Sequence, residues 1–149
     1  MKHRIMIFII LILLLTTGCK ANIGKNEIGE DYEDNTVTAA VEKDAIVERS
    51  EIISDTIVEL FGIDDATTVI FNNSALVGVK TAYDQELTQD TKEIIESKVL
   101  NIDSDISEVL ITNKERVFTE IDNIVIELLQ GKSYDDLVDN ISKIKGKFN

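Results

Sequence analysis

Apolar and polar residues divide the chain into three stretches. Positions 5–15 are apolar without interruption, and positions 20–36 are polar and contain glycine. From about Val41 onward, apolar residues recur at helical spacing, and short runs rich in β-branched residues interrupt this pattern. The predicted order of elements is helix, strand, strand, helix, strand, helix, helix, which is typical of an α+β fold.

Four helices are expected in the C-terminal stretch, each with one apolar face. Their apolar residues are Ile46, Ile53, Ile57 and Leu60; Leu87, Ile94, Ile95, Val99 and Ile102; Val117, Phe118, Ile121, Ile124, Val125 and Leu128; and Leu137, Val138, Ile141 and Ile144. The expected caps are Gly62 after the first helix, Thr88 before the second, Asn113 and Gly131 around the third, and a capping box of Ser133 and Asp136 before the last.

Three strands are expected, at residues 66–71, 75–81 and 109–112, and the turn residues at 72–74 join the first two as a hairpin. The segments then form a small αββαβ core, a three-stranded sheet with helices on one face, followed by C-terminal helices. Such an arrangement leaves a free sheet face or an edge for a partner. The isolated Gly78 favours a bulge or a close helix crossing over a phosphate cradle.

The N-terminal residues have the form of a bacterial lipoprotein signal peptide. Residues 2–4 (KHR) precede the apolar run, whose eleven residues are too short to cross a hydrocarbon core of roughly 30 Å. The small residues 16–18 (TTG) then lead into Cys19, as in a lipobox, although Thr16 stands where leucine is usual. The alternative is an uncleaved anchor that ends in an incidental thiol.

This interpretation divides the chain into a signal peptide at 1–18, a lipidated, flexible acidic linker at 19–36 and a single domain at 37–149. Cys19 is the lipidation site, acylated on its sulfur, and it holds the protein to the extracytoplasmic face of the cell membrane. The formal charge of −13 becomes −15 when Lys2 and Arg4 leave with the signal peptide. Such an acidic domain disfavours nucleic acid and is repelled by an anionic bilayer, so lipid must hold it there.

Candidate catalytic groups are few. His3 is the only histidine and Cys19 the only cysteine, so neither triad catalysis nor a His/Cys zinc or haem site is expected beyond the leader. No cofactor, metal site or enzymatic activity is predicted. Two sets of acidic residues remain as candidates for the catalysis of hydrolysis. Their positions in solvated loops and at helix N-termini explain them more simply. The two sets are Asp84, Glu86 and Asp90, and Asp103 with Asp105.

An acidic cluster within the linker leaves calcium binding open. Its members are Glu30, Asp31, Glu33 and Asp34. Their spacing does not match an EF-hand loop, and a solvated linker is the favoured interpretation.

Three segments of the chain carry a family resemblance. They are TTVIFNNSALVGV at 67–79, ELTQDTKEIIESKVLNIDSDISEVLIT at 86–112 and LLQGKSYDDLVDNI at 128–141. With the Gly18-Cys19 pair, they resemble the YhcN/YlaJ family of sporulation lipoproteins from endospore-forming Firmicutes. The resemblance implies a lipoprotein of the inner spore membrane or the forespore, with a part in spore formation, germination or outgrowth. It carries over no catalytic residues, only Cys19 as the lipid site.

Three hypotheses of function follow. The first is a non-enzymatic, lipid-anchored sporulation protein that acts by binding a protein partner. The second is a self-associating structural module that forms rings or lattices on the membrane. The third is a carboxylate-dependent hydrolase of envelope material, for which the chain lacks tryptophan and has few aromatic residues to stack on sugars.

Overall fold

The computed structural model describes residues 35–148, and their side chains from residue 44 onward. The expected signal peptide, Cys19 and the acidic cluster of the linker lie outside the described residues. The elements of the described part are α2 (Asn35–Val58), β1 (Ile63–Phe71), β2 (Ser74–Thr81), α3 (Gln89–Ile102), β3 (Glu108–Thr112), α4 (Glu115–Leu129) and α5 (Val138–Lys145).

The strands form one mixed sheet in the order β1-β2-β3. β1 and β2 are an antiparallel hairpin whose tight turn pairs Phe71 with Ser74, and Asn72 adopts φ 54° there. β3 runs parallel to β2, with Val77 opposite Ile111. The predicted α+β class and αββαβ order are therefore confirmed, and so are the three strands, each of which begins one to three residues earlier than expected.

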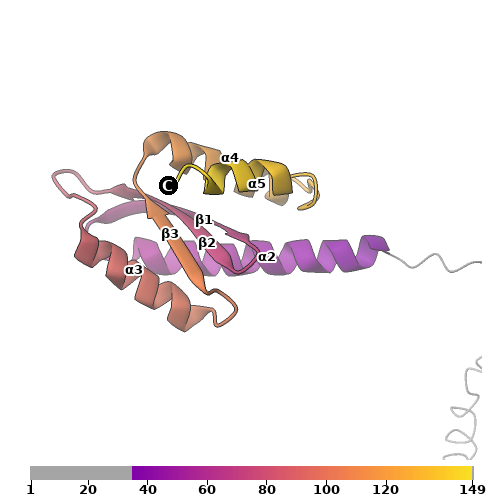
Figure 1. The fold of residues 1–149 in the computed structure, drawn as a ribbon, viewed down its shortest axis with the longest axis horizontal. Coiled ribbons are helices and arrows are strands. Elements are labelled where there is room, and N and C mark those ends of the chain that lie inside the picture. The colour runs from indigo at the N-terminus through magenta and orange to yellow at the C-terminus, as the bar shows by residue number, and fades with distance from the viewer. Residues whose placement is uncertain (1–34, 149) are drawn as a thin grey trace, which may run out of the picture. The chain divides into compact units, whose positions relative to one another are not determined.

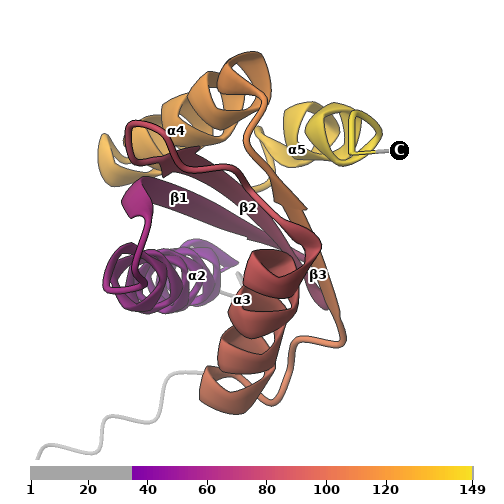
Figure 2. The ribbon, with the colours of Figure 1, turned by 90° about the vertical axis from the view of Figure 1, so that its left-hand side faces the viewer.

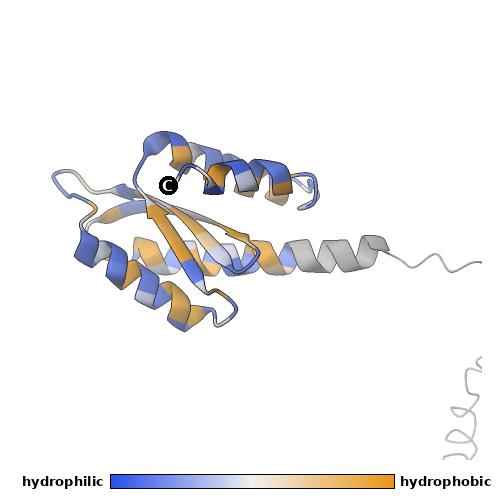
Figure 3. Cartoon of the chain, in the orientation of Figure 1, coloured by the Kyte–Doolittle hydropathy of each residue, from blue (hydrophilic) through white to orange (hydrophobic). Residues whose placement is uncertain are grey.

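The sheet carries helices on both faces (Figures 1 and 2). α2 and α3 pack together on one face, as the prediction for the αββαβ core required, and α4 and α5 cover the other. Alternation along the strands supplies both cores, because successive side chains point to opposite faces. Figure 3 shows the strands as predominantly hydrophobic and the helices as banded. The expectation of a free sheet face is wrong, since the C-terminal helices occupy it.

Two separate clusters of buried residues fill these faces. The α2/α3 cluster contains Ile53, Ile57, Ile63, Ile70, Ala75, Val77, Val79, Ile95, Val99 and Ile106. The α4/α5 cluster contains Val69, Leu76, Val117, Ile121, Ile124, Leu128, Leu137, Ile141 and Ile144. Asp34–Asn149 is a compact unit, and both clusters lie entirely within it. This stretch therefore has the cores that it needs to fold without the residues before it.

Gly78 lies where α4 crosses β2. A Cβ built on it would come within 3.0 Å of the Cα of Phe118 and 3.1 Å of its ring. The prediction of a close helix crossing is confirmed, and the irregularity of the β1–β2 ladder lies elsewhere, between Ile63 and Asp65. Only a residue without a side chain lets the α4 backbone approach this closely.

The helix ends follow the predicted caps in part. Thr88 caps α3 by accepting a hydrogen bond from the Thr91 N–H, as expected. Gly131, at φ 94°, ends α4 with hydrogen bonds from Gly131 N–H to the Leu128 carbonyl and from Lys132 N–H to the Glu127 carbonyl, which is the Schellman pattern.

Three other predicted helix ends are wrong. α4 is capped by Lys114 without a side-chain bond, so Asn113 does not cap it. α5 begins after a turn at Leu137, which is buried, so Ser133 and Asp136 form no capping box. α2 starts at Asn35 and ends at Val58, so Gly62 does not cap it. Gly62 lies in the turn that follows, with φ 86°. Burial of Leu137 sets the start of α5 more strongly than local capping does.

Candidate interaction surface

The carboxylates singled out in the sequence form no catalytic pair. Asp84, Glu86 and Asp90 lie exposed between β2 and the first turn of α3, whereas Asp103 and Asp105 follow its last turn. Asp90, which is the member of the first group nearest to the second along the chain, lies thirteen residues before Asp103, about 20 Å along the helix. The carboxylate separations that glycosidases use are at most about 9.5 Å, so these groups do not act together.

Asp103 is part of a structural ion pair. Its two carboxylate oxygens accept hydrogen bonds from Arg49 Nε at 2.7 Å and Arg49 Nη2 at 3.0 Å, and the Asp105 N–H bonds one of them at 3.0 Å. The Asp103 side chain is 10% exposed. The Arg49 hydrogen bond holds the pKa of Asp103 below its ordinary value and raises that of Arg49. Asp103 therefore links α2 to the end of α3.

No metal site is present within residues 44–148. Among them, no three histidine, cysteine, aspartate or glutamate side chains gather in a way that could hold an ion. The acidic cluster of the linker was the calcium candidate, and it lies outside this range.

Sequence reasoning missed the most exposed aromatic residues. Phe61, in the loop from α2 to β1, is 94% exposed, and Tyr83, in the loop from β2 to α3, is 91% exposed. The Ala82 N–H donates to the Gly62 carbonyl at 3.0 Å, and a Cβ on Gly62 would meet the Gln85 side chain at 3.5 Å. The two loops therefore lie side by side at one end of the sheet (Figure 1). We call Phe61, Tyr83 and their loops the aromatic tip.

The aromatic tip is surrounded by negative charge. Exposed carboxylates in or beside its two loops are Glu59, Asp64, Asp84 and Glu86. Asp65 is bound to Lys80 at 2.8 Å, so that cation is already engaged. In the sequence, Phe61 directly follows the apolar positions of α2 that are buried. The spacing of apolar residues therefore does not show whether Phe61 is buried or exposed. Its exposure depends on the turn at Gly62.

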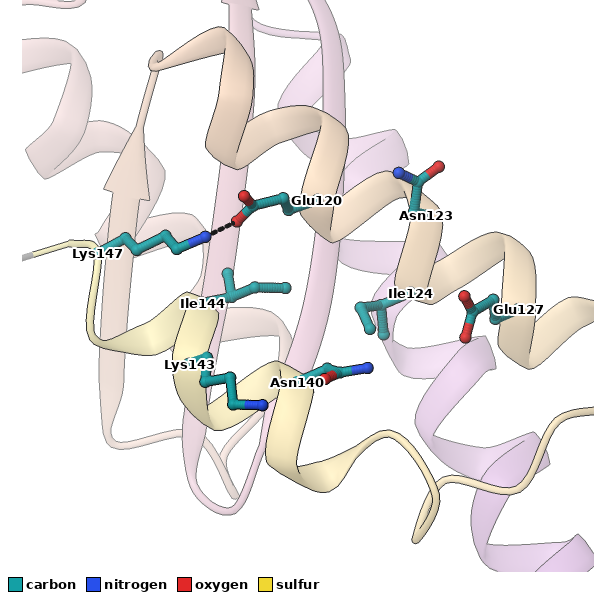
Figure 4. Close-up of a pocket in the computed structure, with 8 residues that line it drawn as sticks. All are labelled: Glu120, Asn123, Ile124, Glu127, Asn140, Lys143, Ile144 and Lys147. Carbon is teal, nitrogen blue, oxygen red and sulfur yellow. Dashed lines mark hydrogen bonds and ion pairs between the residues drawn. The ribbon is translucent and has the colours of Figure 1, made fainter.

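A shallow groove between α4 and α5 is the second surface feature (Figure 4). It has a volume of about 250 Å³ and is lined by Glu120, Asn123, Ile124, Glu127, Asn140, Lys143, Ile144 and Lys147. We call it the α4–α5 groove. Ile124 and Ile144 are buried beneath it, while Asn123, Asn140 and Lys143 are exposed at its rim.

Both glutamates of the groove are paired with cations. Glu120 accepts hydrogen bonds from Lys147 and, at 3.2 Å, from Arg116. The Lys147 hydrogen bond lowers the pKa of Glu120, and Arg116 adds to the effect. Glu127 binds Lys132 at 2.7 Å. The charge that is left over at the rim belongs to Lys143, which makes no ion pair with a residue of the described part.

Comparison with protein families identifies the chain. The model of the sporulation lipoprotein YhcN/YlaJ family matches residues 20–149. The chain belongs to this family. The resemblance drawn from residues 67–141 is thereby confirmed. No curated protein sequence matches the chain.

Membership of the YhcN/YlaJ family carries two general statements. The protein has a role in sporulation, and as a lipoprotein it associates with a membrane through a lipid anchor. Within the described residues, none of the helices combines the length and the hydrophobicity needed to span a bilayer.

Proposed function

We propose that this YhcN/YlaJ-family protein is a non-enzymatic, lipid-anchored module that binds a protein partner at the spore or forespore membrane. Cys19 carries the lipid, and the domain lies on the extracytoplasmic face. The binding contributes to spore formation, germination or outgrowth. The observation that carries the proposal is the aromatic tip, where Phe61 and Tyr83 stand almost fully in solvent on two hydrogen-bonded loops.

Exposed aromatic residues on a rigid support suit protein recognition. Aromatic side chains bury large areas on binding and are enriched among the residues that dominate interface energies. The tip is fixed by the first register pair of the sheet, Ile63 with Thr81, so little conformational entropy is lost when it docks. Its carboxylates favour a partner with basic groups and disfavour an anionic bilayer.

Catalysis has weaker support than binding. Among the five candidate carboxylates, Asp103 alone is not exposed, and it is engaged by Arg49 and has a lowered pKa. A general acid needs the opposite shift, because it must stay protonated near neutral pH. The carboxylates Asp84, Glu86 and Asp90 at the start of α3 are exposed to solvent.

The test replaces Phe61 and Tyr83 together by alanine in the full chain in its spore-forming host. We expect normal amounts of membrane-bound protein and the same spore defect as in a strain that lacks the chain, because the folded domain stays anchored but loses its binding surface. The matched control is Ile94→Ala, which removes a half-exposed apolar side chain from α3. If the double variant formed normal spores while the deletion strain formed defective ones, the proposal would be refuted.

The anchor is tested separately with Cys19→Ala. Without acylation, the acidic domain has no attraction to the membrane and is expected in the soluble fraction. A Cys19→Ala protein that remains with the membrane would show that the apolar run itself serves as the anchor.

A further inference from the structure

The α4–α5 groove has the dimensions of a pocket for one side chain. Its volume of about 250 Å³ is below the roughly 300–1,000 Å³ of typical small-molecule sites. Ile124 and Ile144 form an apolar floor, and the amides of Asn123 and Asn140 stand at the edge (Figure 4). An apolar floor with a polar rim is the usual setting for an aromatic anchor at an interface.

The charge of the groove distinguishes it from two other grooves in the described residues. The groove on α3 is lined by Glu93 and Glu96 and is acidic. The groove between α2 and α3 holds Arg49, whose charge is already balanced by Asp103. In the α4–α5 groove, Lys143 is the unbalanced group. An acidic ligand is therefore favoured at the α4–α5 groove and disfavoured or indifferent at the other two.

The acidic aromatic tip of the same chain has the complementary properties. It offers one aromatic side chain, Phe61 or Tyr83, for the apolar floor, and Asp84 and Glu86 for Lys143. We infer that a partner at the aromatic tip is a second copy of this chain, whose α4–α5 groove receives the tip. The inference rests on the proposed protein-binding function and names the partner.

Such a contact is heterologous, because the tip and the groove are different surfaces of each copy. Each copy keeps a free groove or a free tip after pairing, so the association continues into a ring or an open chain. Anchoring on one membrane raises the effective concentration of copies and favours weak contacts of this kind.

Sedimentation of the compact unit at 34–149 tests the inference. The wild-type domain is expected to form oligomers whose mass rises with concentration. Phe61→Ala with Tyr83→Ala should weaken association about tenfold or more, as loss of an aromatic anchor does. Lys143→Glu should weaken it severalfold by opposing the acidic tip. The matched control Lys98→Glu, an exposed lysine on α3, should leave it unchanged.

Cysteine cross-linking tests the pairing itself. The stretch at 34–149 has no cysteine, so Gln85→Cys, in the same loop as Tyr83, and Asn140→Cys introduce unique thiols. A chain that carries both is expected to give a ladder of oxidised oligomers, and an equal mixture of the single variants should give dimers only. Gln85→Cys combined with Lys98→Cys is the control and should give no ladder.

A domain that stays monomeric at every concentration, or oligomers that survive both the tip and the Lys143→Glu variants, would overturn the inference. A ladder from the Lys98→Cys control equal to that from Asn140→Cys would also overturn it. These results are distinct from failure of the proposed function. A monomeric domain whose Phe61 and Tyr83 variants still damage spores would keep the binding function and remove only the second copy as its partner.

Discussion

The two faces of the sheet are closed by different means. On the α2/α3 face, an ion pair lies beside the aliphatic core. Arg49 of α2 donates two hydrogen bonds to Asp103 at the end of α3. On the α4/α5 face, the decisive contact is one of shape, because α4 lies directly on the backbone of Gly78. Charge joins two helices to each other on one side, and close packing joins a helix to the sheet on the other.

Polar bonds on the α4/α5 face attach the C-terminal segment to the strands. The Tyr134 hydroxyl donates to the Ile70 carbonyl at 3.0 Å, and Lys145 binds Glu108 at 2.6 Å. The Lys145 hydrogen bond, with help from Ser74, holds the pKa of Glu108 below its ordinary value. Charged links therefore occur on both faces, whereas the close crossing at Gly78 lies on the α4/α5 face.

Truncation of the core should have the largest effect and should be the same on both faces. Ile53 and Ile121 are fully buried, one in each cluster, so Ile53→Ala and Ile121→Ala should each lower the free energy of unfolding by about 2–5 kcal/mol. Urea unfolding of the domain at 34–149, followed by circular dichroism, measures this loss. A second transition in Ile121→Ala, with α2 and α3 still folded, would show that the two faces unfold independently.

A side chain at Gly78 should have the next largest effect and should act on the α4/α5 face. Gly78→Ala places a Cβ against the backbone of Phe118, which cannot move aside as a flexible side chain would, so a loss of about 1–3 kcal/mol is expected. The control is Gly146→Ala, whose Cβ would make ordinary contacts from 3.5 Å and should change stability by less than about 0.5 kcal/mol. Equal thermal midpoints for the two variants would contradict the close crossing.

Loss of the ion pair between Arg49 and Asp103 should have the smallest effect and should depend on pH. Arg49→Met is expected to cost about 1–2 kcal/mol near neutral pH, because Arg49 is one-third exposed and solvent weakens the pair. Asp103 has a lowered pKa when folded, so its contribution is complete above the ordinary aspartate value of about 3.9 and is lost as the pH falls through the folded value.

The difference in stability between the wild type and Arg49→Met should therefore shrink below about pH 4. Chemical unfolding at a series of pH values measures it. Arg116→Met is the matched control, since Arg116 is 85% exposed and its pair with Glu120 should contribute less than about 0.5 kcal/mol. A difference for Arg49→Met that stays constant down to strongly acidic pH would exclude Asp103 as its partner.

The strands and the helix stripes were predictable because their signals are local. The β-branched runs of β1 and β2 and the helical spacing of Ile53 and Ile57 are signals that span only a few residues each. The cap at Thr88 was equally local, since a side chain bonds a backbone group three residues away. The caps assigned to Asn113 and Ser133 were wrong, because α4 begins after Lys114 and α5 begins after the buried Leu137.

The candidate surface was less predictable than the fold. In the sequence, nothing distinguishes Phe61 and Tyr83 from aromatic residues of the core. Their exposure follows from two loops that are distant along the chain and adjacent in space. The α4–α5 groove likewise depends on how far apart two helices pack. Asp103 was recognised as a carboxylate of interest, but its role required the partner Arg49, 54 residues away.

By itself, the sequence determined the family, the α+β class and the order of the segments, because the patterns that carry them extend over a few residues, and it left Gly78 as either a bulge or a close helix crossing. Only the tertiary structure decided that α4 and α5 cover the second face, that Asp103 is structural, and that aromatic side chains remain in solvent at one end of the sheet. Those outcomes depend on contacts between distant segments, which are selected by burial of the whole core and not by any one stretch of the chain.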